Sequence, residues 1–207
     1  MIGLVDYGMG NLGSIANMIR KMGGQSKIVQ TPDELLSCSK LILPGVGAFD
    51  TAIKNLKDLG LWESLHQFAL QDKKPLLGIC LGMQVLCKGS EEGNLPGLGW
   101  INAEVKRFNF NGNTRLKIPH MGWNIVRPVQ EAFPLFRNWE DEMRFYFVHA
   151  YAVQCEDPAE AMGKTMYGYE YDSVIAKDNI MGMQCHPEKS HRFGMLVYKN
   201  FIELQAN

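Results

Sequence analysis

Gly78-Ile79-Cys80-Leu81-Gly82-Met83 is the most informative stretch of this 207-residue chain. An apolar run precedes it and apolar residues at helical spacing follow it, which predicts a strand, a sharp turn at Cys80 and a helix. Glycine two residues before and two residues after the centre of such a turn avoids side-chain collisions. A thiol at the start of a helix is favoured as the thiolate, so Cys80 is a candidate nucleophile. The motif alone leaves open a second interpretation, in which Cys80 is a small buried apolar residue.

Composition predicts a single domain, residues 1–207, with a well-filled core. The formal net charge is −1, without a basic patch or an acidic tail, so neither nucleic acid nor a membrane is expected as a partner. Five cysteines without a Cys-x-x-Cys pair favour reduced thiols in a cytoplasmic protein. We expect no metal site and no cofactor.

Strands and helices alternate through the first half of the chain. The predicted apolar strands are 2–6, 27–30, 41–43 and 76–79. The predicted helices are 12–22, one that begins with a capping box at Thr31 and Glu34, 53–59, 61–70, and one behind Cys80. This order is typical of a parallel sheet covered by helices on both faces. Catalytic groups then belong at the carboxyl ends of the strands, where Cys80 and the turn 44–47 fall.

The second half of the chain is richer in strands. They are predicted near 101–108, 116–118, 144–148, 153, 165–169, 173–176 and 180–184, before a closing helix at 190–204. The expected fold class is α/β, with a central, mostly parallel sheet flanked by helices and an appended antiparallel β region.

A thiolate nucleophile needs a base, and the base needs an orienting group. The segment 183–188 supplies both, because a strand leads to His186 and Glu188 follows two residues later. Alone, this pair reads more simply as a turn with a solvated carboxylate. Together with a cysteine at a strand-to-helix turn, it favours a Cys80–His186–Glu188 triad.

The motifs together resemble the class I (triad) glutamine amidotransferases. Within that family the chain is most similar to the glutaminase subunits of imidazole glycerol phosphate synthase, and the resemblance covers essentially the whole chain. It rests on Gly78 to Gln84 and on five further motifs, which are Asp6-Tyr7-Gly8-Met9-Gly10-Asn11, Leu43-Pro44-Gly45-Val46-Gly47-Ala48-Phe49, Pro119-His120-Met121-Gly122-Trp123-Asn124, Phe145-Tyr146-Phe147-Val148-His149 and His186-Pro187-Glu188-Lys189-Ser190.

The resemblance implies roles for individual residues. Cys80 would attack the carboxamide of glutamine, His186 would move protons, and Glu188 would orient His186. Backbone groups of Gly45, Val46, Gly47 and Leu81 would stabilise the developing oxyanion. The glutamine-binding residues would be Gln84, Glu92 and Tyr151. For Glu92, a solvated loop is nearly as good an interpretation.

The resemblance also implies a partner. The family docks as a heterodimer onto a (β/α)₈ cyclase/synthase subunit, into which it passes ammonia, away from water. The residues carried over to that interface are Asn11, Met121, Trp123, Asn124, Tyr146 and Lys189. For Trp123 and Tyr146 the alternative is an ordinary place in the core, and an exposed aromatic patch would favour docking.

Three other functions remain open from the sequence. Cys185, Cys87 and Ala150 depart from the expected pattern. The segment from His186 to Gly194 also resembles paralogues that supply ammonia for sugar amidation in surface polysaccharides. Gly8-Met9-Gly10-Asn11-Leu12-Gly13 formally matches a dinucleotide fingerprint, although the second strand does not end in the acidic residue that binds ribose. A stand-alone cysteine hydrolase commonly places His after the nucleophile, where this chain has Leu81.

Overall fold

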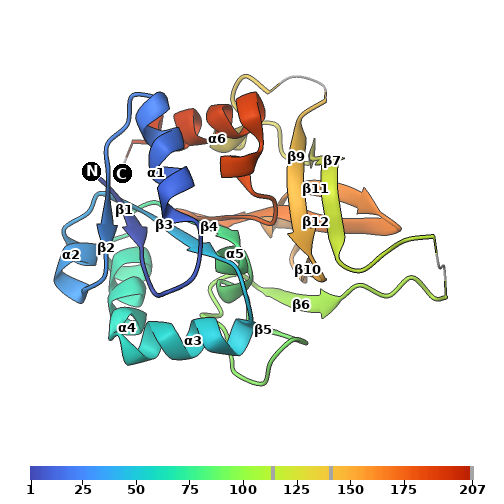
Figure 1. Ribbon diagram of the computed structural model, residues 1–207, viewed down its shortest axis with the longest axis horizontal. Helices are drawn as coiled ribbons and strands as arrows, with labels where there is room; N and C mark the ends of the chain where they lie inside the picture. Colours follow the sequence, from blue (N-terminus) through green and yellow to red (C-terminus); the bar gives the residue numbers. More distant parts are fainter. Residues whose placement is uncertain (113–114, 140–141, 206–207) are drawn as a thin grey trace.

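An eight-stranded sheet runs through the computed structural model, which describes residues 1–112, 115–139 and 142–205 (Figure 1). The strand order is β2-β1-β3-β4-β13-β12-β11-β8. The first five strands of that order are parallel: β2 (Ser26–Val29), β1 (Ile2–Val5), β3 (Lys40–Gly45), β4 (Leu76–Cys80) and β13 (Ile180–Met183). The last three extend the sheet in antiparallel fashion: β12 (Tyr169–Lys177), β11 (Ala161–Tyr167) and β8 (Arg127–Pro128).

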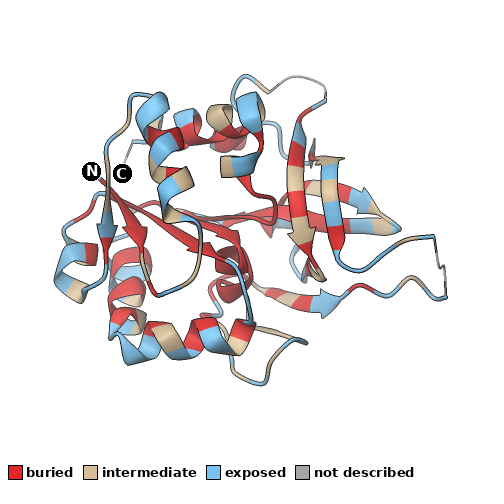
Figure 2. Cartoon of the chain, in the orientation of Figure 1, coloured by how far each residue is buried: buried red, intermediate tan, exposed pale blue. Residues whose placement is uncertain are grey.

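Helices cover both faces of the parallel strands (Figure 1). On one face lie α1 (Leu12–Lys21) and α6 (His191–Glu203), and on the other lie α2 (Pro32–Leu36), α3 (Phe49–Asp58), α4 (Leu61–His66) and α5 (Leu81–Val85). Alternate residues of each strand therefore enter different cores, as in β3, where Leu41 and Leu43 join one cluster and Ile42 joins the other. Figure 2 shows the inner strands buried along their length, which explains why their sequences are continuously apolar.

Two smaller sheets flank the antiparallel end of the large sheet, on the right in Figure 1. In one, β7 (His120–Ile125) pairs antiparallel with β9 (Arg144–His149). The other has the order β10-β6-β5, with bounds Tyr151–Cys155, Ala103–Arg107 and Gly89–Ser90. Short 3₁₀ turns occupy Pro134–Phe136, Pro158–Glu160 and Pro187–Lys189. The last of these turns follows β13 at the edge of the sheet where β4 also ends.

The predicted fold class is confirmed, and so is the capping box, in which Thr31 and Glu34 cap each other's backbone. Two of the predicted segments differ in type from the structure. The helix predicted at 61–70 is α4 followed by a π-helical turn, Gln67–Gln71. The strand predicted at 116–118 is wrong, because that segment is irregular and the strand β7 begins after Pro119. Proline lacks the N–H that pairing of strands needs. Apolar residues on the exposed face of β7 hide the alternation of apolar and polar side chains along it.

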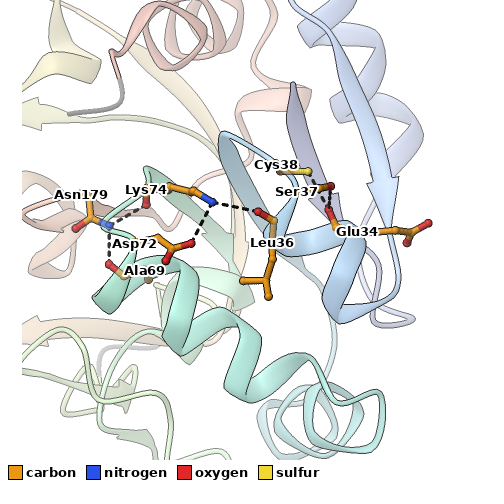
Figure 3. Close-up of polar contacts among 8 residues, drawn as sticks. All are labelled: Glu34, Leu36, Ser37, Cys38, Ala69, Asp72, Lys74 and Asn179. Atoms are coloured by element: carbon orange, nitrogen blue, oxygen red, sulfur yellow. Dashed lines mark hydrogen bonds and ion pairs between the residues drawn. The ribbon is translucent and has the colours of Figure 1, made fainter.

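Asn179 fixes the start of β4, the strand that ends at Cys80 (Figure 3). Its side-chain amide donates to the carbonyl oxygens of Ala69 at 2.9 Å and Lys74 at 2.8 Å, and its own carbonyl accepts from the N–H of Leu76 at 3.0 Å. The ammonium of Lys74 in turn contacts Asp72 and the carbonyl of Leu36. These bonds hold the entrance to β4 beside the entrance to β13, so the register of the two strands is set before they reach the functional edge.

Candidate active site at the carboxyl edge of the sheet

Cys80 occupies a strained turn between β4 and α5. Its backbone angles are φ 54° and ψ −108°, which non-glycine residues rarely adopt. A Cβ atom on Gly78 would lie 2.7 Å from the carbonyl oxygen of Gly82, and one on Gly82 would lie 1.8 Å from the carbonyl oxygen of Leu43. The steric reason for the two glycines, predicted from the sequence, is therefore confirmed.

His186 and Glu188 form a buried pair next to Cys80. Nδ1 of His186 lies 2.7 Å from Oε1 of Glu188, and the two side chains are 2% and 3% exposed. Burial alone lowers the pKa of His186, but the Cys80 sulfur and the Glu188 carboxylate outweigh burial and raise that pKa to about 10. The imidazole is therefore protonated at neutral pH and can act as an acid toward a group that leaves beside the sulfur.

The backbone around His186 is anchored to β9. The N–H of His186 donates to the carbonyl of Tyr146 at 2.8 Å, and the hydroxyl of Ser190 donates to the carbonyl of His186 at 2.6 Å. The same hydroxyl accepts from the N–H of Tyr146 at 3.0 Å. Nε2 of His186 is buried and has no hydrogen-bond partner among the residues that the structure describes. That nitrogen is the one available for proton transfer.

A cavity of about 310 Å³ opens over Cys80. Its volume is at the lower end of the range for ligand pockets, roughly 300–1,000 Å³, and suits a molecule of amino-acid size. Most of the residues that the sequence assigned to oxyanion stabilisation and substrate binding line it. The lining residues are Val46, Gly47, Cys80, Leu81, Gln84, Glu92, Pro119, Val148, His149, Ala150 and Tyr151.

A wider hollow of about 870 Å³ lies elsewhere, beside the amino ends of β4 and β13, and is lined among others by Pro75 and Asn179. Its lining includes none of the predicted catalytic residues. Because open parallel sheets bind ligands at the carboxyl ends of their strands, the smaller cavity is the candidate site.

The candidate oxyanion turn follows β3 directly beside Cys80. Gly45 pairs with Cys80 in the strand register and is buried, whereas Val46 and Gly47 are exposed. Gly47 has φ 117°, a conformation that L side chains rarely adopt, and a Cβ on Gly45 would lie 2.6 Å from the hydroxyl of Tyr7. Leu81 begins α5 immediately after Cys80. The structure thus brings all four predicted backbone positions around one sulfur.

The predicted substrate-binding side chains differ in burial. Glu92 is exposed, and its carboxylate accepts from the N–H of Phe49 at 3.0 Å. Gln84 is buried, and its amide nitrogen donates to the carbonyl of Tyr151 at 3.2 Å and to Oε1 of Gln184 at 3.1 Å. Both hydrogens of that nitrogen are therefore used within the protein. The amide oxygen of Gln84 is the atom left to accept from a ligand.

Sequence reasoning missed a buried row of polar rings behind the cavity. The hydroxyl of Tyr171 lies 3.1 Å from Nδ1 of His120 and 3.1 Å from Nε2 of His149. Burial lowers the pKa of His120 to about 4 and that of His149 to about 3, so both rings are neutral at pH 7. Both histidines stand inside motifs that the sequence singled out. Their spacing in the chain gave no signal that Tyr171, on β12, would join them.

The six residues predicted to face a partner lie on several elements near β7 and α6. Met121 and Trp123 on β7 are 62% and 47% exposed, which argues against a core position for Trp123. Its ring stacks on His191 at 5.3 Å and meets Tyr146 edge-on at 6.3 Å. Asn11 and Lys189 are exposed, and Asn124 and Tyr146 are half-buried. The structure therefore presents an aromatic patch beside the candidate site.

The loop that matches a dinucleotide fingerprint lacks one of its physical features. Gly8 and Gly10 have φ 82° and 114°, so both are needed for the turn. The third glycine of a fingerprint allows close packing of helix on strand, but a Cβ on Gly13 would meet nothing within 4 Å. The loop geometry does not support nucleotide binding.

Neither a membrane-spanning helix nor a metal cluster occurs in the described ranges. In residues 1–112, 115–139 and 142–205, no helix is long and apolar enough to cross a membrane. The same residues contain no group of three or more His, Cys, Asp or Glu side chains arranged to hold a metal ion.

The chain is similar to known proteins over nearly its whole length. Residues 3–204 match the family model for class-I glutamine amidotransferase. The imidazole glycerol phosphate synthase subunit HisH 2 of Methanococcus maripaludis is 51% identical over 203 residues, which are 98% of this chain and 99% of that protein. The corresponding HisH subunit of Bdellovibrio bacteriovorus is 45% identical, over 99% of this chain and all of that protein.

Among solved structures, a putative GMP synthase subunit from Thermoplasma acidophilum superposes with a TM-score of 0.72 at 20% identity. The match covers 97% of this chain and 91% of that one. A structure described only as a glutamine amidotransferase gives a TM-score of 0.73 at 17% identity and covers 97% of both chains. At such low identity these structures support the fold alone.

Proposed function

This chain belongs to the class-I glutamine amidotransferase family, and we propose that it is the glutaminase subunit of an imidazole glycerol phosphate synthase. It hydrolyses L-glutamine to glutamate and ammonia, and the ammonia is used in histidine biosynthesis. The relatives reported above are imidazole glycerol phosphate synthase subunits, so the sugar-amidating alternative is not favoured. Residues 1–207 act in this proposal as one glutaminase domain.

The reaction begins with attack of the Cys80 thiolate on the carboxamide carbon of glutamine. The bond between that carbon and nitrogen breaks, and His186 gives its Nε2 proton to the departing ammonia. A glutamyl thioester remains on Cys80 and His186 becomes neutral. The neutral imidazole then takes a proton from water, which attacks the thioester and releases glutamate and the thiolate. Glu188, at 2.7 Å from Nδ1, keeps the ring oriented through both steps.

Negative charge develops on the substrate carbonyl oxygen in each step, first on that of the carboxamide and then on that of the thioester. The N–H of Leu81 and the backbone of Gly45, Val46 and Gly47 are the proposed donors, because they border the cavity or the sulfur itself. Gly47 gives the turn the conformational freedom to reorient a peptide when a partner binds.

The ammonium group of the substrate is recognised by acceptors. The carboxylate of Glu92 and the free amide oxygen of Gln84 are both available at the cavity, while Tyr151 flanks it. A ligand with a donor group at this end is favoured over one with a second carboxylate, which both acceptors would repel.

The ammonia acceptor is proposed to be a (β/α)₈ cyclase/synthase subunit that docks as a heterodimer over the exposed patch of Met121 and Trp123. The other interface residues in this proposal are Asn11, Asn124, Tyr146 and Lys189. Docking there covers the face beside the sulfur, so ammonia need not enter water. Cytoplasmic location is part of the same proposal and is consistent with five cysteines outside any disulfide bond.

The single observation that carries the proposal is the buried His186–Glu188 pair beside Cys80 under a cavity of amino-acid size. The test measures glutamate release from glutamine, first without and then with an imidazole glycerol phosphate synthase cyclase subunit plus its nucleotide substrate. We expect the cyclase subunit and its nucleotide substrate to stimulate glutamate release, and a folded Cys80→Ala variant to be inactive. Hydrolysis of glutamine by Cys80→Ala would refute the mechanism. Glutamate release that the cyclase subunit and its nucleotide substrate do not stimulate would refute the assignment to this synthase.

A further inference from the structure

Gln184 makes a contact with the nucleophile that the triad does not explain. It lies between β13 and His186, is fully buried, and places its amide nitrogen 3.6 Å from the sulfur of Cys80. Its amide oxygen accepts from Gln84 at 3.1 Å. A buried glutamine therefore touches a reacting atom on one side and a residue of the cavity on the other.

The direction of these hydrogen bonds is fixed by a backbone carbonyl. The carbonyl oxygen of Tyr151 can only accept, so the end of the Gln84 amide that faces it must be the nitrogen. The same nitrogen faces Gln184, so Gln184 must turn its oxygen toward Gln84. Its own nitrogen is then left facing Cys80. The sulfur consequently meets an N–H donor, which favours negative charge on it.

Of the other groups near the Cys80 sulfur, some favour negative charge on it and others do not. The His186 imidazolium is the cation that faces it, as the raised pKa of His186 shows. Three further groups also lie within electrostatic reach: Cys185, beside His186, and the phenols of Tyr7, which follows β1, and Tyr171 on β12. Cys80 raises the pKa of each, as expected of neutral groups. The Gln184 amide is a neutral donor that does not titrate, so it favours negative charge on the sulfur at every pH.

We propose that Gln184 stabilises the Cys80 thiolate by donating a hydrogen bond to its sulfur, while Gln84 and Tyr151 hold the Gln184 amide in that orientation. This role rests on the proposed glutaminase function. The bond is strongest when the sulfur is anionic, before attack and again when the thioester breaks down, and it weakens in the neutral thioester. Gln184 thus keeps the thiolate ready before substrate binds and stabilises it as the leaving group afterwards.

Two substitutions separate the donor from the shape of the side chain. Gln184→Glu keeps an acceptor for Gln84 and places an anionic group beside the sulfur. Gln184→Met keeps the length of the side chain and removes both polar atoms. Gln154→Met, on the exposed face of β10, is the matched control.

The measurement is the pH dependence of Cys80 alkylation by iodoacetamide, followed by mass spectrometry of the Cys80 peptide. We expect the midpoint to rise by about one pH unit in Gln184→Met, which is a tenfold loss of thiolate at pH values well below the midpoint, and to rise further in Gln184→Glu. Gln154→Met should match the wild type. An unchanged midpoint in a folded Gln184→Met variant would overturn the proposal.

A titration of the unsubstituted chain gives the answer if a variant does not fold. The ¹⁵N chemical shift of the Gln184 side-chain amide should change with pH at the same midpoint as Cys80 alkylation. A chemical shift that does not change at that midpoint would overturn the proposal. Neither readout requires turnover of glutamine. Glutamate release measured in parallel reports on the proposed function, so the two can fail separately.

Discussion

Nδ1 of His149 lies 2.7 Å from the carbonyl oxygen of Tyr151, and this contact fixes the tautomer of the ring. Because the carbonyl only accepts, Nδ1 carries the hydrogen and Nε2 of His149 must accept from Tyr171. The oxygen of Tyr171 then accepts from His120, whose other nitrogen accepts from Asn124 at 3.3 Å. Each group in this row donates to the next, from Asn124 on β7 to the carbonyl of Tyr151. The same carbonyl also orients Gln84.

The hydroxyl of Tyr171 is the central link of this row. Tyr171→Phe would leave one buried nitrogen of His149 without a donor and one of His120 without an acceptor, so we expect a loss of about 1–3 kcal/mol in the free energy of unfolding. Urea denaturation measures this loss. Tyr169→Phe on the same strand is the control and should cost less, because Tyr169 is only half-buried. Equal losses in the two variants would contradict the argument.

Acid should destabilise the protein through the two buried histidines. Their pKa values, about 3 for His149 and about 4 for His120, lie below the ordinary value of about 6.5 that they regain on unfolding. Between these values the unfolded chain binds protons that the native protein does not, so stability falls as pH drops below about 6.5. Each histidine contributes a slope of up to about 1.4 kcal/mol per pH unit.

The prediction for acid is checked with His149→Gln. The free energy of unfolding of this variant should fall less steeply between pH 6 and 4, by up to about 1.4 kcal/mol per unit, whatever its stability at pH 7. Between pH 7 and 8 the two curves should run parallel, because neutral His149 has no proton to lose there. Parallel curves below pH 6 as well would show that His149 is already protonated in the native state.

Much of the fold was predictable because the strands and helices follow local rules. The parallel strands are continuously apolar, and Thr31, Gly78 and Gly82 stand where a cap and a tight turn require them. Strand β7 was missed because Met121 and Trp123 put apolar side chains on its exposed face. Periodicity reports burial, so exposed apolar side chains hide the alternation of a strand.

The candidate site was predictable where chemistry dictates residue type. A nucleophile, a base and an orienting carboxylate can be recognised by their spacing, and the structure brings Cys80, His186 and Glu188 together. Gln184 and Tyr171 were not predicted, because a buried amide or phenol can serve many purposes and its partner depends on the fold. Their roles follow only once the direction of each hydrogen bond is known.

Glu188 should act through His186 and not on the substrate. Glu188→Gln keeps the shape of the side chain but removes a charge that raises the pKa of His186, so that pKa should fall from about 10. We expect the turnover number for glutamine to drop about 10²–10⁴-fold with a much smaller change in KM. Steady-state kinetics and NMR titration of the imidazole measure the two effects. A variant with normal turnover would remove Glu188 from the mechanism.

Trp123 should contribute to docking without contributing to the chemistry. Its ring is 47% exposed on β7 and is stacked on His191, so it is presented rigidly to a partner. Exposed aromatic residues at the centre of an interface commonly contribute about 2 kcal/mol or more, so Trp123→Ala should weaken docking onto a (β/α)₈ synthase subunit by about 30-fold or more. Calorimetric titration with that subunit measures the change.

Ile28→Ala is the control, because Ile28 is 51% exposed on β2, at the edge of the eight-stranded sheet away from its antiparallel end, and it should bind as the wild type does. If Ile28→Ala weakened binding and Trp123→Ala did not, the docking surface would lie at the β2 edge, far from the sulfur, and ammonia released at Cys80 would have no direct path to the partner.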